Sequence, residues 1–224
     1  MNPNISLNQK MRLIGLRIGF DEKVAPRNKL NALDYDLEET LIESIYEAQN
    51  DLRILRILVS WIKIHGGYVI VEKLFKRLKA WESIRGVNPI FELLIGIAVT
   101  SGHLKWGKYG KATPKKPIYP GNETLLKSSI SVKGEDENLS KLGIKVPRGY
   151  LNPRDSDVFT PNELLSVNHQ YRNRYLFGPN WRADIITAIE CGFENPSQIS
   201  KKIGCSYEPA YRTYHEYQAW KSSS

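Results

Sequence analysis

Apolar residues recur at steps of three and four along much of the chain, which is the spacing of one face of an amphipathic helix. The first stripe follows the acidic start at 36 and ends at Gly66-Gly67, and it predicts one long helix. Similar stripes predict helices over 69–81 and 89–100. These helices can enclose a small core, to which 104–106 is expected to add a short wing-like strand.

The helix expected over 69–81 carries four basic residues on its predicted outer face, Lys73, Lys76, Arg77 and Lys79. A basic helix after a Gly-Gly break fits a helix-turn-helix relative in this part of the chain. Ordinary solvated surface is the alternative explanation, since basic residues commonly line the exposed side of a helix.

The helical pattern resumes after a stretch rich in Gly, Pro and Lys. Thr160 and Glu163 predict a capping box that opens a helix to about residue 175. Asn180 is the expected N-cap of a further helix over 181–191.

Together these elements predict a mainly α-helical fold in four segments. An N-terminal arm covers 1–37, and a helical domain, with a winged-helix-like form as one option, covers 38–108. An irregular linker rich in Lys, Pro and Gly follows over 109–157, and a helix-turn-helix domain with winged-helix-like character covers 158–224.

Residues 196–215 contain a helix, a glycine-centred turn and a second helix. Gly204 stands where the turn needs a positive φ. The inward positions of the motif then fall on Ile199, Ser200, Ile203, Cys205, Ala210 and Thr213. Ser206 is expected to cap the second helix through its hydroxyl, with Pro209 in the first turn.

Residues 181–220 resemble the helix-turn-helix and winged-helix superfamily of bacterial transcriptional regulators. The phrase over 177–185 is also similar to regulators of which some accompany nucleotidyltransferase-type toxins as antitoxins. Thr213 is more polar than the family pattern, and this sequence offers no residues for a C-terminal two-stranded wing, so a bare three-helix unit is expected.

The resemblance implies a sequence-specific DNA-binding protein, a transcriptional regulator or an autoregulatory antitoxin, that acts without catalysis. Double-stranded DNA is the expected partner and a homodimer the expected state. A cognate toxin or another protein is left open as a further partner.

Base contacts in a major groove would come from the start of the second helix of the motif. The residues there are Ser206, Tyr207, Glu208, Tyr211, Arg212 and His215. Arg212 can donate two hydrogen bonds to guanine, and Glu208 can accept from cytosine. Contacts to the phosphate backbone are expected from Lys201, Lys202, Arg172, Arg174 and Arg182.

The formal net charge of +8 favours a polyanionic partner, and its distribution refines that statement. Residues 105–156 hold eleven basic against five acidic residues, whereas 157–224 hold seven of each. Lys111, Lys115 and Lys116 are therefore expected to supply phosphate contacts from a basic aromatic arm. A flexible linker kept soluble by its lysines explains the same residues.

An alternative function comes from the aromatic residues of the last helix, Tyr207, Tyr211, Tyr214, Tyr217 and Trp220. Aromatic residues are enriched at protein–protein contacts, so this helix also fits a non-catalytic protein-interaction module.

Signatures of catalysis, metal binding and membrane insertion are not found in the sequence. It has no phosphate-binding glycine loop, dinucleotide fingerprint, nucleophile elbow or zincin motif. Cys191 and Cys205 lack zinc-ligand spacing, and helix capping explains the acidic run over 34–39. No cofactor or metal is expected. Charges interrupt the apolar stretches over 1–20 and 54–64, so a cytoplasmic protein without a membrane segment is expected.

Overall fold

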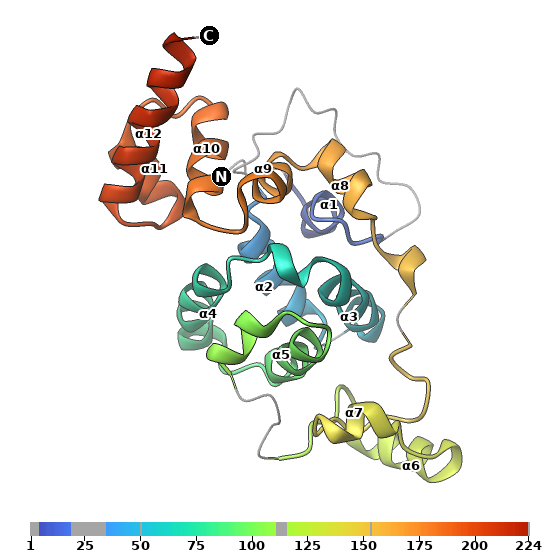
Figure 1. The fold of residues 1–224 in the computed structure, drawn as a ribbon. Helices are drawn as coiled ribbons and strands as arrows, with labels where there is room; N and C mark the ends of the chain where they lie inside the picture. Colours follow the sequence, from blue (N-terminus) through green and yellow to red (C-terminus); the bar gives the residue numbers. More distant parts are fainter. Residues whose placement is uncertain (1–4, 19–34, 50, 111–115, 153, 224) are drawn as a thin grey trace.

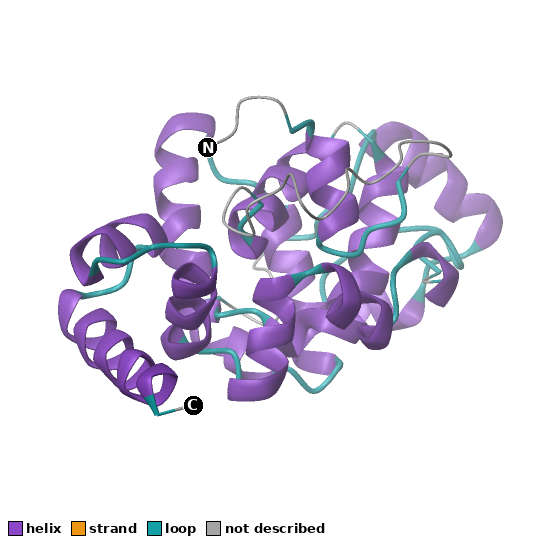
Figure 2. Cartoon of the chain, turned by 90° about the horizontal axis from the view of Figure 1, so that it is seen from above, coloured by secondary structure: helices purple, strands orange, loops and turns teal. Residues whose placement is uncertain are grey.

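The computed structural model describes residues 5–18, 35–49, 51–110, 116–152 and 154–223, and over these residues the fold is mainly helical (Figures 1 and 2). Isolated β-bridges occur there, but no β-strand does. The α-helices are α1 (Leu7–Leu13), α2 (Leu37–Glu47), α3 (Leu52–His65), α4 (Val71–Arg85), α5 (Ile90–Thr100), α6 (Glu123–Lys133), α7 (Glu137–Lys141), α8 (Pro161–Val167), α9 (His169–Phe177), α10 (Trp181–Glu190), α11 (Pro196–Ile203) and α12 (Tyr207–Ser222), and the 3₁₀ turns are η2 (Gly66–Tyr68), η3 (Leu104–Lys108) and η4 (Asp155–Asp157).

The long helix expected from 36 to the Gly-Gly pair is two helices, α2 and α3. The side chain of Asp51 accepts a hydrogen bond from the backbone N–H of Arg53 and starts α3 as its N-cap. The apolar stripe continues across the break because both helices turn their apolar faces to the same core. A side-chain cap thus separates helices that hydrophobic periodicity joins.

The main core is formed by α1 to α5 together with parts of α8, α9 and the segments between. Trp61 of α3 is fully buried in this core, and its indole N–H donates to the carbonyl of Ile14 at 2.6 Å. This contact ties the N-terminal helix α1 to α3. The expected irregular arm is therefore helical over Leu7–Leu13, with a capping box formed by Ser6 and Gln9, while 19–34 lie outside the described residues.

The expected wing strand at 104–106 is instead part of η3. Trp106 is fully buried, and its indole N–H donates to the carbonyl of Gly66 at 3.0 Å. Tyr109 stacks on Phe75 of α4, with ring centroids 5.0 Å apart. The expected wing strand is thus wrong at these residues, because Trp106 of η3 and the following Tyr109 pack onto η2 and α4.

The segment over 109–157 is not an irregular linker where it is described. The side chains of Asn122 and Asp136 cap α6 and α7, and Ile118 forms a parallel bridge with Ile144. Ile144, Val146, Leu151 and Val158 are buried in the main core. The Lys, Pro and Gly content misled the sequence prediction because the buried apolar residues between them are few and widely spaced.

The helix expected over 160–175 is divided at Asn168, which ends α8 and caps α9. The predicted capping box of Thr160 and Glu163 is confirmed, as is the Asn180 cap of α10. Leu164 and Tyr171 belong to the main core. Helices α8 and α9 therefore pack with the N-terminal helices, and α9 also contacts α10, so no boundary between separate units falls at 158, where the C-terminal domain was expected to start.

A second, smaller core lies between α10, α11 and α12. Its buried members are Ile185, Ala188, Ile199, Ile203 and Ala210. This C-terminal unit and the α6–α7 part lie at opposite ends of the view in Figure 1. Among the described residues no helix is long and apolar enough to cross a bilayer.

Candidate nucleic-acid interface

The turn between α11 and α12 has the geometry that the sequence predicts. Gly204 ends α11 in the left-handed conformation, with φ +81° and ψ 20°. Asn195 caps the start of α11 through hydrogen bonds from the backbone N–H groups of Ser197 and Gln198. Helix α11 is therefore defined at both ends by local chemistry, and its direction relative to α12 is set by one glycine.

The inward positions of the motif are buried as predicted. Ile199, Ile203 and Ala210 lie in the second core, while Ser200 and Thr213 are 9% and 5% exposed. Cys205 is half-buried against the same core, and neither it nor Cys191 is in a disulfide. One expected detail is wrong: Ser206 occupies the N-cap position of α12, but its hydroxyl makes no capping hydrogen bond.

The predicted base-reading residues share the outer face of α12. Tyr207 and Tyr211 are 55% and 48% exposed, and Glu208, Arg212 and His215 are exposed as well. Ring centroids lie 5.9 Å apart between Tyr207 and Tyr211 and 4.2 Å apart between Tyr211 and His215. The structure thus brings together, in one exposed row, side chains that can donate, accept and stack.

The residues predicted to contact phosphates differ in their exposure and in their present partners. Lys201 is exposed and Lys202 half-buried on α11. Arg182 pairs with Glu216 at 2.7 Å, and Arg172 approaches Glu190 to 3.5 Å, so an acidic residue already lies beside each of these two cations. Such exposed pairs are weak and leave the arginines able to exchange partners.

Arg174 cannot contact a phosphate, and this prediction is wrong. Its side chain is fully buried, where it pairs with Glu38 of α2 and Asp184 of α10. Its sequence neighbourhood looks like an ordinary basic helix, and only the packing of α9 between α2 and α10 turns this side chain inward.

Arg174 belongs to a group that we call the buried ion cluster, made of Asp36, Glu38, Lys73, Arg174 and Asp184. Lys73 was expected on the outer face of its helix, but it is 1% exposed and contacts all three carboxylates. Gln170 adds a hydrogen bond to Asp184 at 3.1 Å. The cluster connects α2, α4 and α9 to α10 and so fixes the C-terminal unit on the main core.

Lys73 and Asp184 of the buried ion cluster stay charged. Burial alone would lower the pKa of Lys73, but the charges of Asp184, Asp36 and Glu38 outweigh it and raise the pKa above its ordinary value. Burial would raise the pKa of Asp184, and the charges of Arg174 and Lys73 lower it instead. Oxygens of Asp36, Glu38 and Asp184 lie within 4.8 Å of one another, which suits a metal ion, but the Lys73 ammonium and the Arg174 guanidinium already supply the positive charge.

A basic residue that sequence reasoning did not assign to the interface lies beside the turn. The ammonium of Lys76 on α4 donates to the carbonyl of Gly204 at 3.0 Å, and Lys79 is exposed one turn further along α4. The pairing spans 128 positions in the chain, so no local pattern could have revealed it. The basic face of α4 therefore adjoins the turn of the motif.

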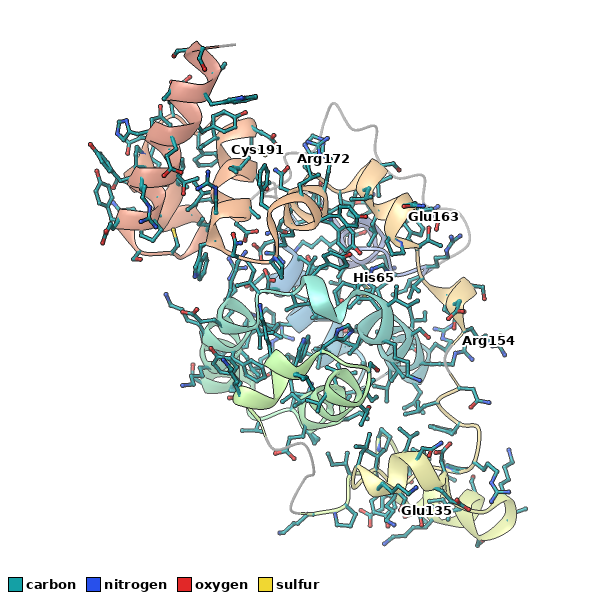
Figure 3. All side chains as sticks on the ribbon, viewed as in Figure 1. His65, Glu135, Arg154, Glu163, Arg172 and Cys191 are labelled. Atoms are coloured by element: carbon teal, nitrogen blue, oxygen red, sulfur yellow. The ribbon has the colours of Figure 1, made fainter. Side chains whose placement is uncertain are left out.

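Of the basic arm expected around Lys111, Lys115 and Lys116, the structure describes only the last of these three lysines. Lys111 and Lys115 lie outside the described residues, and Lys116 is exposed two positions before the Ile118 bridge to the α6–α7 part. Figure 3 shows Glu135 in that part and Arg172 near the C-terminal unit, on opposite sides of the main core. The described end of this segment thus points away from the motif.

Comparison of the chain with protein-family models, with curated proteins and with solved structures finds no match in any of the three.

Proposed function

We propose that this chain is a sequence-specific DNA-binding protein in which the first half of α12 reads bases in the major groove. The observation that supports the proposal is the pair α11 and α12, joined through Gly204 in the left-handed conformation, with one face of α12 buried and the other exposed. Recognition helices of helix-turn-helix proteins enter the major groove by their N-terminal residues.

The chemistry of the exposed row suits base edges. Arg212 can donate two hydrogen bonds to the O6 and N7 atoms of guanine, and Glu208 can accept from the amino group of cytosine. The rings of Tyr207 and Tyr211 can pack on thymine methyl groups, and Ser206 can bond a phosphate. These roles require side chains that DNA can reach, and the residues of this row are exposed.

In this proposal, the positive charge that attracts the DNA phosphates comes from two helices. Lys201 and Lys202 lie on α11 just before the turn, and Lys76 of α4 contacts the turn at Gly204, with Lys79 exposed one turn further along α4. The C-terminal unit alone has balanced charge, so the contribution of α4 raises the electrostatic attraction of the interface to DNA. The main core is then part of the binding surface as well as a support for it.

As its biological role we propose transcriptional regulation, including autoregulation of the kind that antitoxins perform, by binding rather than by catalysis. The expected ligand is a double-stranded operator, and the expected compartment is the cytoplasm. A cognate toxin or another protein remains a further partner within this proposal.

The test is DNA binding measured by fluorescence anisotropy. A duplex is first selected from a random pool with the wild-type protein, and its affinity is compared with that of a scrambled duplex. Arg212→Ala should cost about 1–3 kcal/mol on the selected duplex and reduce the preference over the scrambled one, because a bidentate contact to guanine is lost. Arg148→Ala removes an exposed arginine near the α6–α7 part and should change neither affinity.

The contribution of α4 has its own readout in the same assay. Replacing Lys76 and Lys79 by Ala should weaken binding to both duplexes alike and reduce the slope of log affinity against log salt by about 2. Lys116→Ala serves as the matched control for loss of an exposed lysine. Absence of any binding at low salt would contradict the proposed function.

A second candidate function is a non-catalytic protein-interaction module. The observation that favours it is the exposure of Trp220, at 61%, near the end of α12. It predicts that substituting the aromatic residues of α12 weakens binding to a partner protein. It also predicts that Arg212→Ala leaves DNA binding unchanged.

A further inference from the structure

Thr213 is a polar residue at an inward position of α12, where it is only 5% exposed. Threonines inside helices commonly satisfy their hydroxyl with the carbonyl four residues earlier, as Thr187 of α10 does with Ala183 at 2.9 Å. The hydroxyl of Thr213 makes no hydrogen bond to any residue that the structure describes, and it stays accessible to solvent. Since buried polar groups are nearly always hydrogen-bonded, this hydroxyl is available to a bound molecule.

The groove that Thr213 lines lies between α10 and α12, which run side by side in the C-terminal unit (Figure 1). It has a volume of about 300 Å³, at the lower end of the size range of small-molecule sites. Its apolar walls come from Phe177, Ile186, Tyr217 and Trp220. Ile186 and Thr213 are buried, whereas the three aromatic residues are partly or largely exposed. A polar atom thus lies deep in a groove whose sides are aromatic rings.

The charged residues of the groove already have partners within the protein. Arg182 pairs with Glu216 at 2.7 Å. Glu190 accepts a hydrogen bond from Asn173 at 2.8 Å and lies 3.5 Å from Arg172. Each carboxylate of the lining therefore lies beside an arginine, and no charge is left over to pair with a charged ligand. The groove favours an uncharged molecule, because a charged one would lose its hydration on entering without gaining a counter-ion.

We propose that this groove binds a small, flat, uncharged aromatic molecule of one or two rings that carries one hydrogen-bonding group. Its ring lies among Phe177, Tyr217 and Trp220, since aromatic rings favour stacked or edge-to-face contacts with one another. Its polar group bonds the hydroxyl of Thr213, which can both donate and accept. At about 100° per residue, Thr213 lies roughly 160° around α12 from Tyr211. The site is therefore on the other side of α12 from the proposed base-reading row and does not depend on DNA binding.

The test is a titration of the full chain with indole, without DNA, followed by two-dimensional proton–nitrogen NMR. Indole is uncharged, has two fused rings and carries one N–H donor. The side-chain N–H signal of Trp220, assigned by its loss in Trp220→Phe, should shift with a dissociation constant of about 1 mM or below. The cation tryptamine and the anion indoleacetate should each bind about threefold or more weakly than indole, because neither finds an unpaired counter-ion in the groove.

Thr213→Val isolates the hydroxyl, because valine keeps the shape of the side chain. The affinity for indole should fall about three- to tenfold, the effect of one lost hydrogen bond. N-methylindole has no N–H to donate and should bind the wild type and this variant alike. The midpoint of urea unfolding should not fall, since the hydroxyl has no protein partner to lose, whereas a purely structural role would lower it. Thr124→Val on α6 is the matched control at an exposed threonine and should leave indole binding unchanged.

Trp220→Ala removes one aromatic wall and should weaken indole binding about threefold or more. Leu125→Ala is its control, since Leu125 is an exposed apolar residue of α6 (66% exposed). It should leave indole binding unchanged.

Three results overturn the proposed site. The first is a Trp220 signal that does not shift at about 10 mM indole, well above the expected dissociation constant. The second is binding of indole that Thr213→Val or Trp220→Ala leaves unchanged. The third is tighter binding of tryptamine or indoleacetate than of indole. None of these results bears on the proposed function, because no DNA is present in the titration.

Discussion

His65 ends α3 inside the main core, where both of its ring nitrogens have partners (Figure 3). Nε2 lies 2.8 Å from the carbonyl of Phe159, an acceptor, so Nε2 carries the proton and donates. Nδ1 lies 2.9 Å from the hydroxyl of Tyr171 and accepts from it. The neutral ring satisfies both contacts, and burial lowers the pKa of His65 from 6.5 to about 4.

This pKa predicts how stability depends on pH. Between pH 6.5 and about 4 the unfolded chain binds a proton at His65 and the folded chain does not, so the free energy of unfolding falls as the pH falls through this window. The loss attributable to His65 is on the order of 3 kcal/mol. Urea unfolding at pH 7 and pH 5 measures the part of this loss that falls in the upper portion of the window, about 2 kcal/mol.

The control replaces His65 itself. His65→Gln should lower stability at pH 7 but flatten the decline between pH 7 and pH 5, since the group that titrates is gone. An unchanged decline in this variant would assign the pH dependence to other groups.

At the scale of elements, caps and turns account for where the helices begin and end. Asn180 and Thr160 each act as the sequence predicts, because a cap needs only its own helix. Breaks between helices on one apolar face are harder to see. Asp51 and Asn168 divide two predicted helices, since periodicity continues across each break.

Gly204 allows a sharp prediction for the turn of the motif. A Cβ at this position would meet no atom within 4 Å, so Gly204→Ala tests backbone conformation without a steric clash. At φ +81° the alanine should cost about 1–2 kcal/mol. Thermal unfolding should show a midpoint lowered by a few degrees.

Gly107→Ala is the matched control, because Gly107 lies outside the positive-φ glycines and a Cβ there makes an ordinary contact with Val99 at 3.5 Å. It should change stability by about 0.5 kcal/mol or less. Equal effects of the two substitutions would contradict the role assigned to the left-handed turn.

At the scale of the whole molecule, the buried ion cluster joins the two cores. Arg174→Met should destabilise the protein by about 3–5 kcal/mol, because Glu38 and Asp184 are left as buried carboxylates with fewer cations. Amide hydrogen exchange should show the loss first in α10 and α9, where the cluster holds the C-terminal unit.

Arg172→Met on the same helix is the control for losing an arginine. Arg172 is 40% exposed and has one long contact to Glu190, so the expected cost is at most about 1 kcal/mol. A cost for Arg174→Met no greater than this would show that the cluster does not hold the two cores together.

The sequence by itself determined what depends on neighbouring residues in the chain: the helical class, most caps, the glycine turn and the inward and outward faces of α11 and α12. These follow from periodicity and from short-range hydrogen bonds. The tertiary structure alone decided which basic residues are available. It buries Lys73 and Arg174 among carboxylates from other helices and brings Lys76 to Gly204. Electrostatic interactions act through space, so whether a basic side chain is available for binding depends on the groups that the fold places beside it.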